Sequence, residues 1–355
     1  MFGAYKKELI ALLGVLILIP SAFAMGKVMK GLSSPDTFDV PGYAYDDPCP
    51  GESAMTSACW TGYYAAFVEK YSAVDALRDL KMRHDVGGGA KTFCHPALHV
   101  IGEAAGKEYG SVAEAYKHGE AFCRSGYHHG VLEGLFGEEG GETMLAELDS
   151  ICTDVKKDTA SYNYFSCVHG IGHGLMAYFR HDLFESLDGC ARLTGDWEQT
   201  TCSGGVFMEN VISNTPEMPS KYLKADDPLY PCTDVAEKFR TQCYLMQTSH
   251  MLIIFEGDFA KTFAACRKTG EYATTCFQSI GRDVSGWSYG AVGAALSLCG
   301  YGANLDERKN CLIGAAADYL LSYSEADARA LCALGEDGAR VPCIETLEWH
   351  VGTMR

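Results

Sequence analysis

The amino-acid sequence predicts an all-α protein folded as a right-handed α/α solenoid of about nine helix-pair repeats with a period of about 35 residues. Three observations predict this fold. Cysteines recur at a regular spacing, small residues follow many of them at a fixed offset, and apolar residues at helical spacing flank them. The recurring cysteines are Cys59, Cys94, Cys123, Cys167, Cys202, Cys243, Cys276, Cys311 and Cys343, at intervals of 29 to 44 residues.

The first segment of the chain has the order of a secretory signal peptide. Two lysines precede an apolar run from about Leu9 to Ile19, and small residues close the segment at Ala24. The run is short for a membrane span of roughly 20 residues. We therefore expect cleavage after Ala24 and export, with an uncleaved anchor as the alternative. The predicted parts are a signal peptide at 1–24, a linker at 25–48 and a disulfide-stapled repeat domain at 49–355.

All sixteen cysteines follow this segment, and their even number favours disulfides in an oxidising compartment. The absence of any C-x-x-C motif argues against a zinc ribbon, a thioredoxin-like site or a c-type haem. Cys94 and Cys123 stand alone in neighbouring repeats, so we expect them to pair with each other. The other fourteen should each crosslink one repeat: Cys49 with Cys59, Cys152 with Cys167, Cys190 with Cys202, Cys232 with Cys243, Cys266 with Cys276, Cys299 with Cys311, and Cys332 with Cys343. A crosslink closing such a short loop contributes about 2–4 kcal/mol.

Within a repeat, the first helix is expected to end near the first cysteine and the second helix to begin at the second. The stretch FAKTFAAC, the loop RKTGEYATT and the stretch CFQSIGRDVSGW illustrate this order. Glycine follows the second or single cysteine by three residues at positions 62, 126, 170, 205 and 314, which would let neighbouring helices approach closely. This architecture resembles the cysteine-rich Sel1-like and tetratricopeptide-type helical repeat proteins. The resemblance covers period and helix pairing, and it implies no activity.

Histidines gather in one part of the chain. Nine of the eleven lie between His84 and His181, over the helices expected to begin at Cys94, Cys123 and Cys167. Each of these helices carries two polar side chains four residues apart, which places both on one face. The pairs are His99 with Glu103, His129 with Glu133, and His169 with His173.

Other polar residues flank these pairs. Pro96 favours a helix start at its own position, so His95 is expected in a cap or loop. His128 points about 100° away from the pair on its helix, so packing or support is its expected part. The next repeat offers Glu209 at the equivalent depth. The cysteine-to-histidine offset is five residues after Cys94 and six in the next two helices, so convergence requires a different local geometry at Cys94.

Imidazole and carboxylate groups together suit a divalent transition metal, with zinc first and iron or copper second. The sequence therefore predicts a metal site within residues 94–210. Its candidate ligands are His95, His99, His128, His129, His169, His173 and Glu209, and its candidate general bases are Glu133 and Glu103. The base would act on a metal-bound water, whose pKa is lowered towards about 7.

Two functions are consistent with these features. The first is an exported metal-dependent enzyme, a hydrolase that uses metal-activated water or, second, an iron or copper oxidoreductase. The second is a non-catalytic solenoid of the cell envelope whose concave groove binds a small molecule, peptide, glycan or protein. The formal charge of −17 argues against nucleic acid or anionic lipid as the partner, and contact with a membrane is expected only through an uncleaved N-terminal segment.

Overall fold

The computed structural model describes residues 48–51, 56–120, 122–137, 141–156, 161–214 and 219–354. The predicted signal peptide and all but the last residue of the linker lie outside these ranges. Every regular element in the described ranges is a helix, which confirms the all-α prediction.

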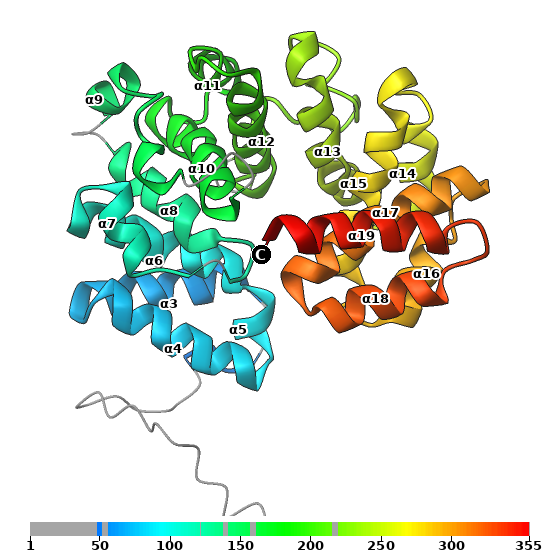
Figure 1. Cartoon of the computed structure of the whole chain (residues 1–355), viewed down its shortest axis with the longest axis horizontal. Coiled ribbons are helices and arrows are strands. Elements are labelled where there is room, and N and C mark those ends of the chain that lie inside the picture. Colours follow the sequence, from blue (N-terminus) through cyan, green and yellow to red (C-terminus); the bar gives the residue numbers. More distant parts are fainter. Residues whose placement is uncertain are drawn as a thin grey trace, which may run out of the picture. The chain divides into compact units, whose positions relative to one another are not determined.

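Nine helices contain a recurring cysteine or closely follow one, and each packs against the next in chain order (Figure 1). They are α3 (Ser57–Lys70), α6 (Cys94–Tyr109), α8 (Gly126–Leu135), α10 (Tyr162–Tyr178), α12 (Asp196–Ile212), α13 (Glu237–Ile254), α15 (Ala273–Trp287), α17 (Leu305–Ser322) and α19 (Arg340–Met354). This order of packing is consistent with a series of helical repeats.

The remaining helices of the described ranges lie between these nine. They are α4 (Ala73–Val86), α5 (Gly89–Thr92), α7 (Val112–Lys117), α9 (Gly141–Ala146), α11 (Leu183–Cys190), α14 (Phe259–Cys266), α16 (Val292–Cys299) and α18 (Glu325–Leu334), with two 3₁₀ turns, η2 (Thr153–Val155) and η3 (Gly270–Tyr272). The helix end expected at the first cysteine of a pair is found at Cys190, Cys266 and Cys299. At Cys332 the helix ends two residues later, at Leu334. The expected end is not found at Cys49, Cys152 and Cys232, which lie in turns or bends.

The helix start expected at the second cysteine of each pair is wrong. Each of these cysteines lies inside its helix, namely Cys59 in α3, Cys167 in α10, Cys202 in α12, Cys243 in α13, Cys276 in α15, Cys311 in α17 and Cys343 in α19. Polar caps upstream of the disulfide set several of the starts, because the side chains of Thr56, Ser161 and Asn304 accept hydrogen bonds from the first turns of α3, α10 and α17. The crosslinks therefore hold the first or second turn of these helices and not their first residues.

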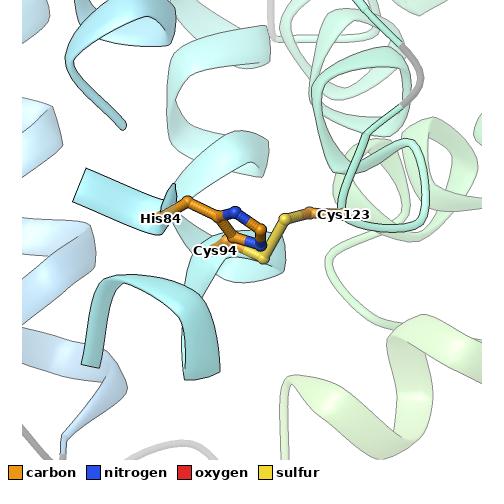
Figure 2. A group of neighbouring side chains, drawn as sticks. All are labelled: His84, Cys94 and Cys123. Carbon is orange, nitrogen blue, oxygen red and sulfur yellow. A yellow bond between two sulfur atoms is a disulfide. The ribbon is translucent and has the colours of Figure 1, made fainter. Parts of the chain in front are cut away.

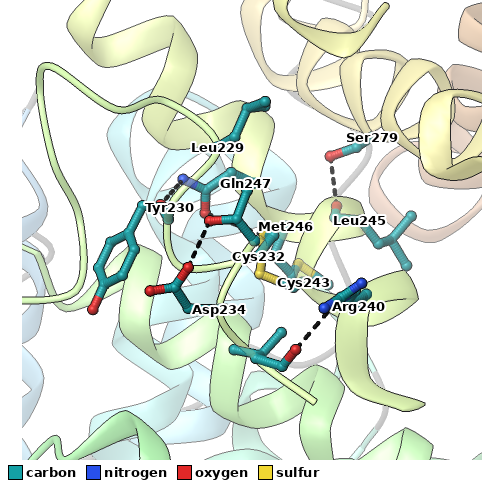
Figure 3. The surroundings of a disulfide bond; sticks show 12 residues. Leu229, Tyr230, Cys232, Asp234, Arg240, Cys243, Leu245, Met246, Gln247 and Ser279 are labelled. Atoms are coloured by element: carbon teal, nitrogen blue, oxygen red, sulfur yellow. Dashed lines mark hydrogen bonds between the residues drawn. A yellow bond between two sulfur atoms is a disulfide. The ribbon is translucent and has the colours of Figure 1, made fainter. Parts of the chain in front are cut away.

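The structure pairs all sixteen cysteines in eight disulfides, and the partners are those expected, including Cys94 with Cys123. Figure 3 shows one crosslink, between Cys232 and Cys243, with its surroundings. There the Gln247 side-chain amide donates to the Tyr230 carbonyl at 2.8 Å. That bond ties the turn before the disulfide to the helix after it, although no helix ends at Cys232.

Helices α6 and α8 lie in backbone contact, and glycine makes this possible. A Cβ atom placed on Gly130 would lie 2.1 Å from the carbonyl oxygen of His99. In the other direction, a Cβ atom on Gly102 would lie 2.1 Å from the carbonyl oxygen of Tyr127. No other residue fits at either position without separating the helices. The close approach predicted from small residues is therefore present where the histidines lie.

An unusual turn precedes α8. Cys123, Arg124 and Ser125 all have left-handed backbone conformations, with φ of 48°, 57° and 58°. Each such residue costs about 1 kcal/mol or more. The Arg124 guanidinium holds the turn from outside, because it pairs with Asp318 and donates to the Ser322 hydroxyl at 2.7 Å. The Cys123 carbonyl is thereby directed towards α6.

Candidate metal centre

Four of the nine cysteine-associated helices, α6, α8, α10 and α12, bring seven ligand-type side chains together. The set comprises His95 and His99 from α6, His129 and Glu133 from α8, His169 and His173 from α10, and Glu209 from α12. His129 is central, because its ring centroid lies 4.7 to 5.5 Å from the centroids of the other four imidazoles. Spacing of four residues places two of these side chains on one face of each of α6, α8 and α10.

The seven side chains form three overlapping groups that could hold a metal ion. In each group, all ligand atoms lie within 4.8 Å of one another. The first group is His95, His99 and His129; the second is His129, His169 and His173; the third is His99, Glu133, His173 and Glu209. The first two contain only imidazoles and share His129.

The centre is largely buried, and Glu133 is the more exposed of its two glutamates. His129, His169 and His173 are 3%, 5% and 0% exposed, whereas the Glu133 side chain retains 17% of its surface. Burial lowers the pKa of His129 and of His173 well below the ordinary value, and the neighbouring imidazoles lower it further. Both rings are therefore neutral at pH 7, which is the form that binds a metal.

In α6, both histidines are oriented through Nδ1. His95 Nδ1 donates to the Cys123 carbonyl oxygen at 2.8 Å, and His99 Nδ1 lies 2.8 Å from the Glu133 carboxylate. The two Nε2 atoms face each other at 3.1 Å. Since a carbonyl can only accept, neutral His95 presents a lone pair at Nε2. A proton or a cation is needed between the two nitrogens.

The histidines of α10 repeat this arrangement. His169 bonds the backbone of Thr201, and since its Nε2 has no partner, the bond belongs to Nδ1. His173 Nδ1 lies 2.8 Å from the Glu209 carboxyl. In both helices, the first histidine is thus held by a backbone carbonyl of the next long helix or its turn, and the second by a glutamate. Metal-binding histidines are usually held in this way.

Three ring nitrogens at the centre are buried without any hydrogen-bond partner: His129 Nδ1, His169 Nε2 and His173 Nε2. They come from one of the three ligand groups. A buried polar atom without a partner costs about 1–3 kcal/mol. Convergence of three such atoms is expected of a metal site.

Two acid–base groups of the centre have raised pKa values. Burial lowers the pKa of His99, but the charge and hydrogen bond of Glu133 outweigh burial and raise it. Burial and the charge of Glu133 raise the pKa of Glu209 to about 8. At neutral pH without a cation, Glu209 therefore keeps its proton beside His173 Nδ1. A cation at Nε2 would favour ionised Glu209 and a proton on Nδ1.

His95 and Glu103 stand differently from expectation, whereas His128 packs as its direction on the helix predicted. His95 lies in the first turn of α6, which begins at Cys94, and not in a cap or loop. Glu103 belongs to none of the groups and pairs with Lys107 at 2.6 Å. His128 also lies outside the groups, with its ring stacked on Tyr116 at 4.0 Å. The roles assigned to Glu103 and His128 remain predictions.

A fourth group, made of His84, Cys94 and Cys123, has ligand-type atoms within the same distance (Figure 2). Its two sulfur atoms are joined in a disulfide, so neither is a thiolate. A thiolate is the form of cysteine that binds metal. This group is therefore set aside while the disulfide is intact.

Sequence reasoning did not find the backbone partners of the histidines, the carbonyls of Cys123 and Thr201. A backbone carbonyl belongs to every residue, so no signal in the sequence could have found these two. The Arg124 link to α17 was missed as well, because it joins residues 194 apart.

Comparison of the chain with protein-family models, curated proteins and solved structures found no match. Within the described residues, every helix is too short or too polar to cross a membrane. The eight disulfides indicate an oxidising compartment.

Proposed function

We propose that this chain is an exported helical repeat protein, a right-handed solenoid of about nine units, that binds a divalent transition metal and uses it in catalysis. Zinc is the first candidate metal, and hydrolysis by metal-activated water is the first candidate reaction. Iron or copper with oxidative chemistry is the second choice.

The convergence of the unpartnered nitrogens of His129, His169 and His173 supports the metal-binding part. Packing alone does not explain these atoms. Both ring nitrogens of a histidine retained for packing would normally form hydrogen bonds, either to the protein or to water. These three histidines are buried too deeply to reach bulk solvent. Their Nδ1 or Nε2 lone pairs are ligands that zinc prefers.

Neutral imidazole ligands support the catalytic part. They leave the full charge of a divalent ion uncompensated, and such an ion lowers the pKa of a bound water towards about 7. Oε1 of Glu133 lies 2.8 Å from His99 Nδ1 and 3.5 Å from His173 Nδ1. Glu133 can therefore orient these rings, and its side chain is more exposed than that of Glu209, 17% against 11%.

Metal content tests the binding part. The full chain should be produced in an oxidising compartment, purified without chelators and analysed by inductively coupled plasma mass spectrometry. We expect at least one equivalent of zinc, iron or copper, and its loss in His129→Ala and His173→Ala. His250→Ala is the matched control, because His250 is a buried histidine outside the centre whose Nε2 bonds the Lys224 carbonyl at 3.0 Å. Folded, metal-free wild-type protein that fails to take up added Zn²⁺ would refute the proposal.

Activity is tested separately, with the metal-loaded protein. A panel of chromogenic ester, amide and phosphodiester substrates should show hydrolysis that disappears after chelation and returns with Zn²⁺. Glu133→Gln should lower kcat by about 10²-fold or more if Glu133 acts as the base. If the protein retains metal but shows no activity on any substrate class, the metal-binding part of the proposal stands and the catalytic part is refuted.

The later helices favour a second function, binding of a partner. Most of the exposed large apolar side chains follow α13, including Trp287, Tyr289 and Trp349 at 50%, 73% and 64% exposure. Exposed tryptophan and tyrosine side chains are enriched at protein–protein interfaces. A peptide, glycan or protein held there would make the chain a scaffold with a structural metal. Pull-down from envelope extracts with wild type and Trp349→Ala would separate this function from catalysis.

A further inference from the structure

We propose that the centre holds two metal ions, one in each all-histidine group, with His129 as the ligand that both share. The inference rests on the metal-binding part of the proposed function and states how many ions the centre takes and which residues hold each. Each ion would be a divalent transition cation of the kind that imidazole binds, such as Zn²⁺ or Cu²⁺.

The number of imidazoles exceeds what one zinc ion uses. A zinc ion in a protein takes about four ligands, of which a catalytic site supplies three from the chain. Five histidines converge here, and they do not form one group with every ligand atom within 4.8 Å. They form two groups of three at that distance, and His129 is the member common to both.

Each group has its own pair of histidines on one helix, with its own supports. The α6 pair is held by the Cys123 carbonyl and by Glu133, while the α10 pair is held by Thr201 and Glu209. Support of a ligand through its second nitrogen fixes the direction of the first. Two complete sets of supports are expected of two sites, because a single ion needs no such duplication.

The glutamates act as supports of the histidines in this arrangement. Glu133 and Glu209 each lie 2.8 Å from an Nδ1 atom, so the Nε2 atoms of His99 and His173 are left for metal. The mixed group of two histidines and two glutamates is then an orienting layer, and the ions lie on the imidazole side. Glu133 and Glu209 are positioning residues by this account.

His129 can serve two ions because an imidazole has two ring nitrogens. Its Nδ1 is buried without a partner, and its ring lies parallel to that of His173 with the centroids 4.7 Å apart. To bind through both nitrogens, the ring must release its single N–H proton to solvent. Binding of the second ion is thus accompanied by release of this His129 proton, and no electron moves.

Native mass spectrometry with Zn²⁺ counts the ions directly. The disulfide-intact full chain should carry two ions. The double variant His95→Ala with His99→Ala should carry one, and the double variant His169→Ala with His173→Ala should also carry one. His129→Ala should lose both at Zn²⁺ concentrations that saturate the wild type. His250→Ala is the matched control, because His250 is a buried histidine outside the centre and belongs to no group; it should carry two.

One ion in the wild type, lost completely in either double variant, would overturn the inference and show a single ion held by both pairs. No ion in the wild type would refute the proposed metal binding itself, so the two failures are distinguishable. Circular dichroism and a count of free thiols show whether each variant is folded. The wild-type count decides the question even if a variant does not fold.

Discussion

The helices α6 to α12 and the helices α13 to α19 share one architecture but treat their buried polar groups differently. In the later region, Thr248 lies 2.5 Å from Ser279 and donates to Asp283 at 2.6 Å. In the earlier region, three histidines of one ligand group each have a buried ring nitrogen with no partner in the protein. The later hydroxyl groups thus have partners within the protein, whereas these three nitrogens do not. The two regions therefore differ in whether their buried polar groups find hydrogen-bond partners within the protein, and this difference indicates where a ligand could bind.

Close backbone contact is common to both regions and so does not distinguish the metal centre. A Cβ atom on Gly314 in α17 would lie 2.0 Å from the Gln278 carbonyl oxygen, much as one on Gly130 would meet His99. Three other buried atoms also lack a partner, His128 Nδ1, His250 Nδ1 and Ser285 Oγ, but none belongs to a ligand group. Convergence is the property that separates the two regions.

Low pH should unfold the region of helices α6 to α12 before that of helices α13 to α19. This loss of stability is the largest effect that we expect. Burial lowers the pKa of His128 and of His169 to about 4. The unfolded chain then binds more protons than the folded one between about pH 6.5 and 4, so stability falls as pH falls through this window, by roughly 3 kcal/mol per histidine. Glu209 and His99, with raised pKa values, act in the opposite direction.

The lowered pKa values of His95, His129 and His173 add to the effect of acid, so the net change should remain destabilising. Hydrogen exchange of the metal-free protein at pH 7 and pH 5 is the measurement. Residues 94–212 should lose protection before residues 237–354, and added Zn²⁺ should delay the loss. If both regions lose protection at the same pH, the predicted difference in their acid stability is wrong.

Gly130→Ala and Gly314→Ala should each destabilise the fold by about 3 kcal/mol, since each forces two helix backbones apart. Only Gly130→Ala should also lower metal content, because the contact that it breaks places His99 beside α8. Urea unfolding and metal analysis of the two variants make the comparison. Equal metal content in both would show that the centre tolerates separation of α6 and α8.

Glu209→Gln should weaken Zn²⁺ binding by about 10- to 100-fold, because His173 loses an anionic support. The matched variant in the later region is Glu307→Gln. Glu307 is similarly buried and accepts two bonds from Arg267 at 2.8 Å each. The Glu307→Gln substitution should lower the stability of the fold and leave the zinc dissociation constant unchanged. A competition titration with a chromophoric chelator measures both constants, and equal changes would contradict a local role for Glu209.

Thr248→Val should have the smallest effect, about 1 kcal/mol of stability. Asp283 keeps a bond from Ser249 at 2.6 Å and an ion pair with Arg282 at 2.8 Å, so the later network is only partly lost. The metal count should not change. A loss of metal in this variant would show that the two regions are coupled through the helix stack.

The period and the cysteine pairs could be read from the sequence, because disulfides close short loops at regular intervals. The pairs of polar residues that share one helix face could also be predicted, because residues four apart in sequence lie on the same face of an α-helix. The exact helix starts could not be read from the cysteines, because local caps such as Asn304 set them ahead of the crosslink.

The choice between Glu103 and Glu133 as the partner of His99 could not be predicted either, because it depends on how α8 packs against α6. The one-residue offset after Cys94 is accommodated because Cys94 begins its helix, whereas Cys123 precedes α8 in the left-handed turn. Both outcomes depend on contacts between helices, which the spacing within one helix does not record.

The Cys94–Cys123 disulfide also has a consequence for timing. It joins the start of α6 to the turn whose carbonyl orients His95. Before oxidation, sixteen thiols compete with five imidazoles for zinc, and thiolates are the softer and stronger ligands. Metal that arrives too early is therefore captured by the wrong side chains. Metal binding as proposed would then follow crosslinking, and the compartment that oxidises the chain would set the order of the two steps.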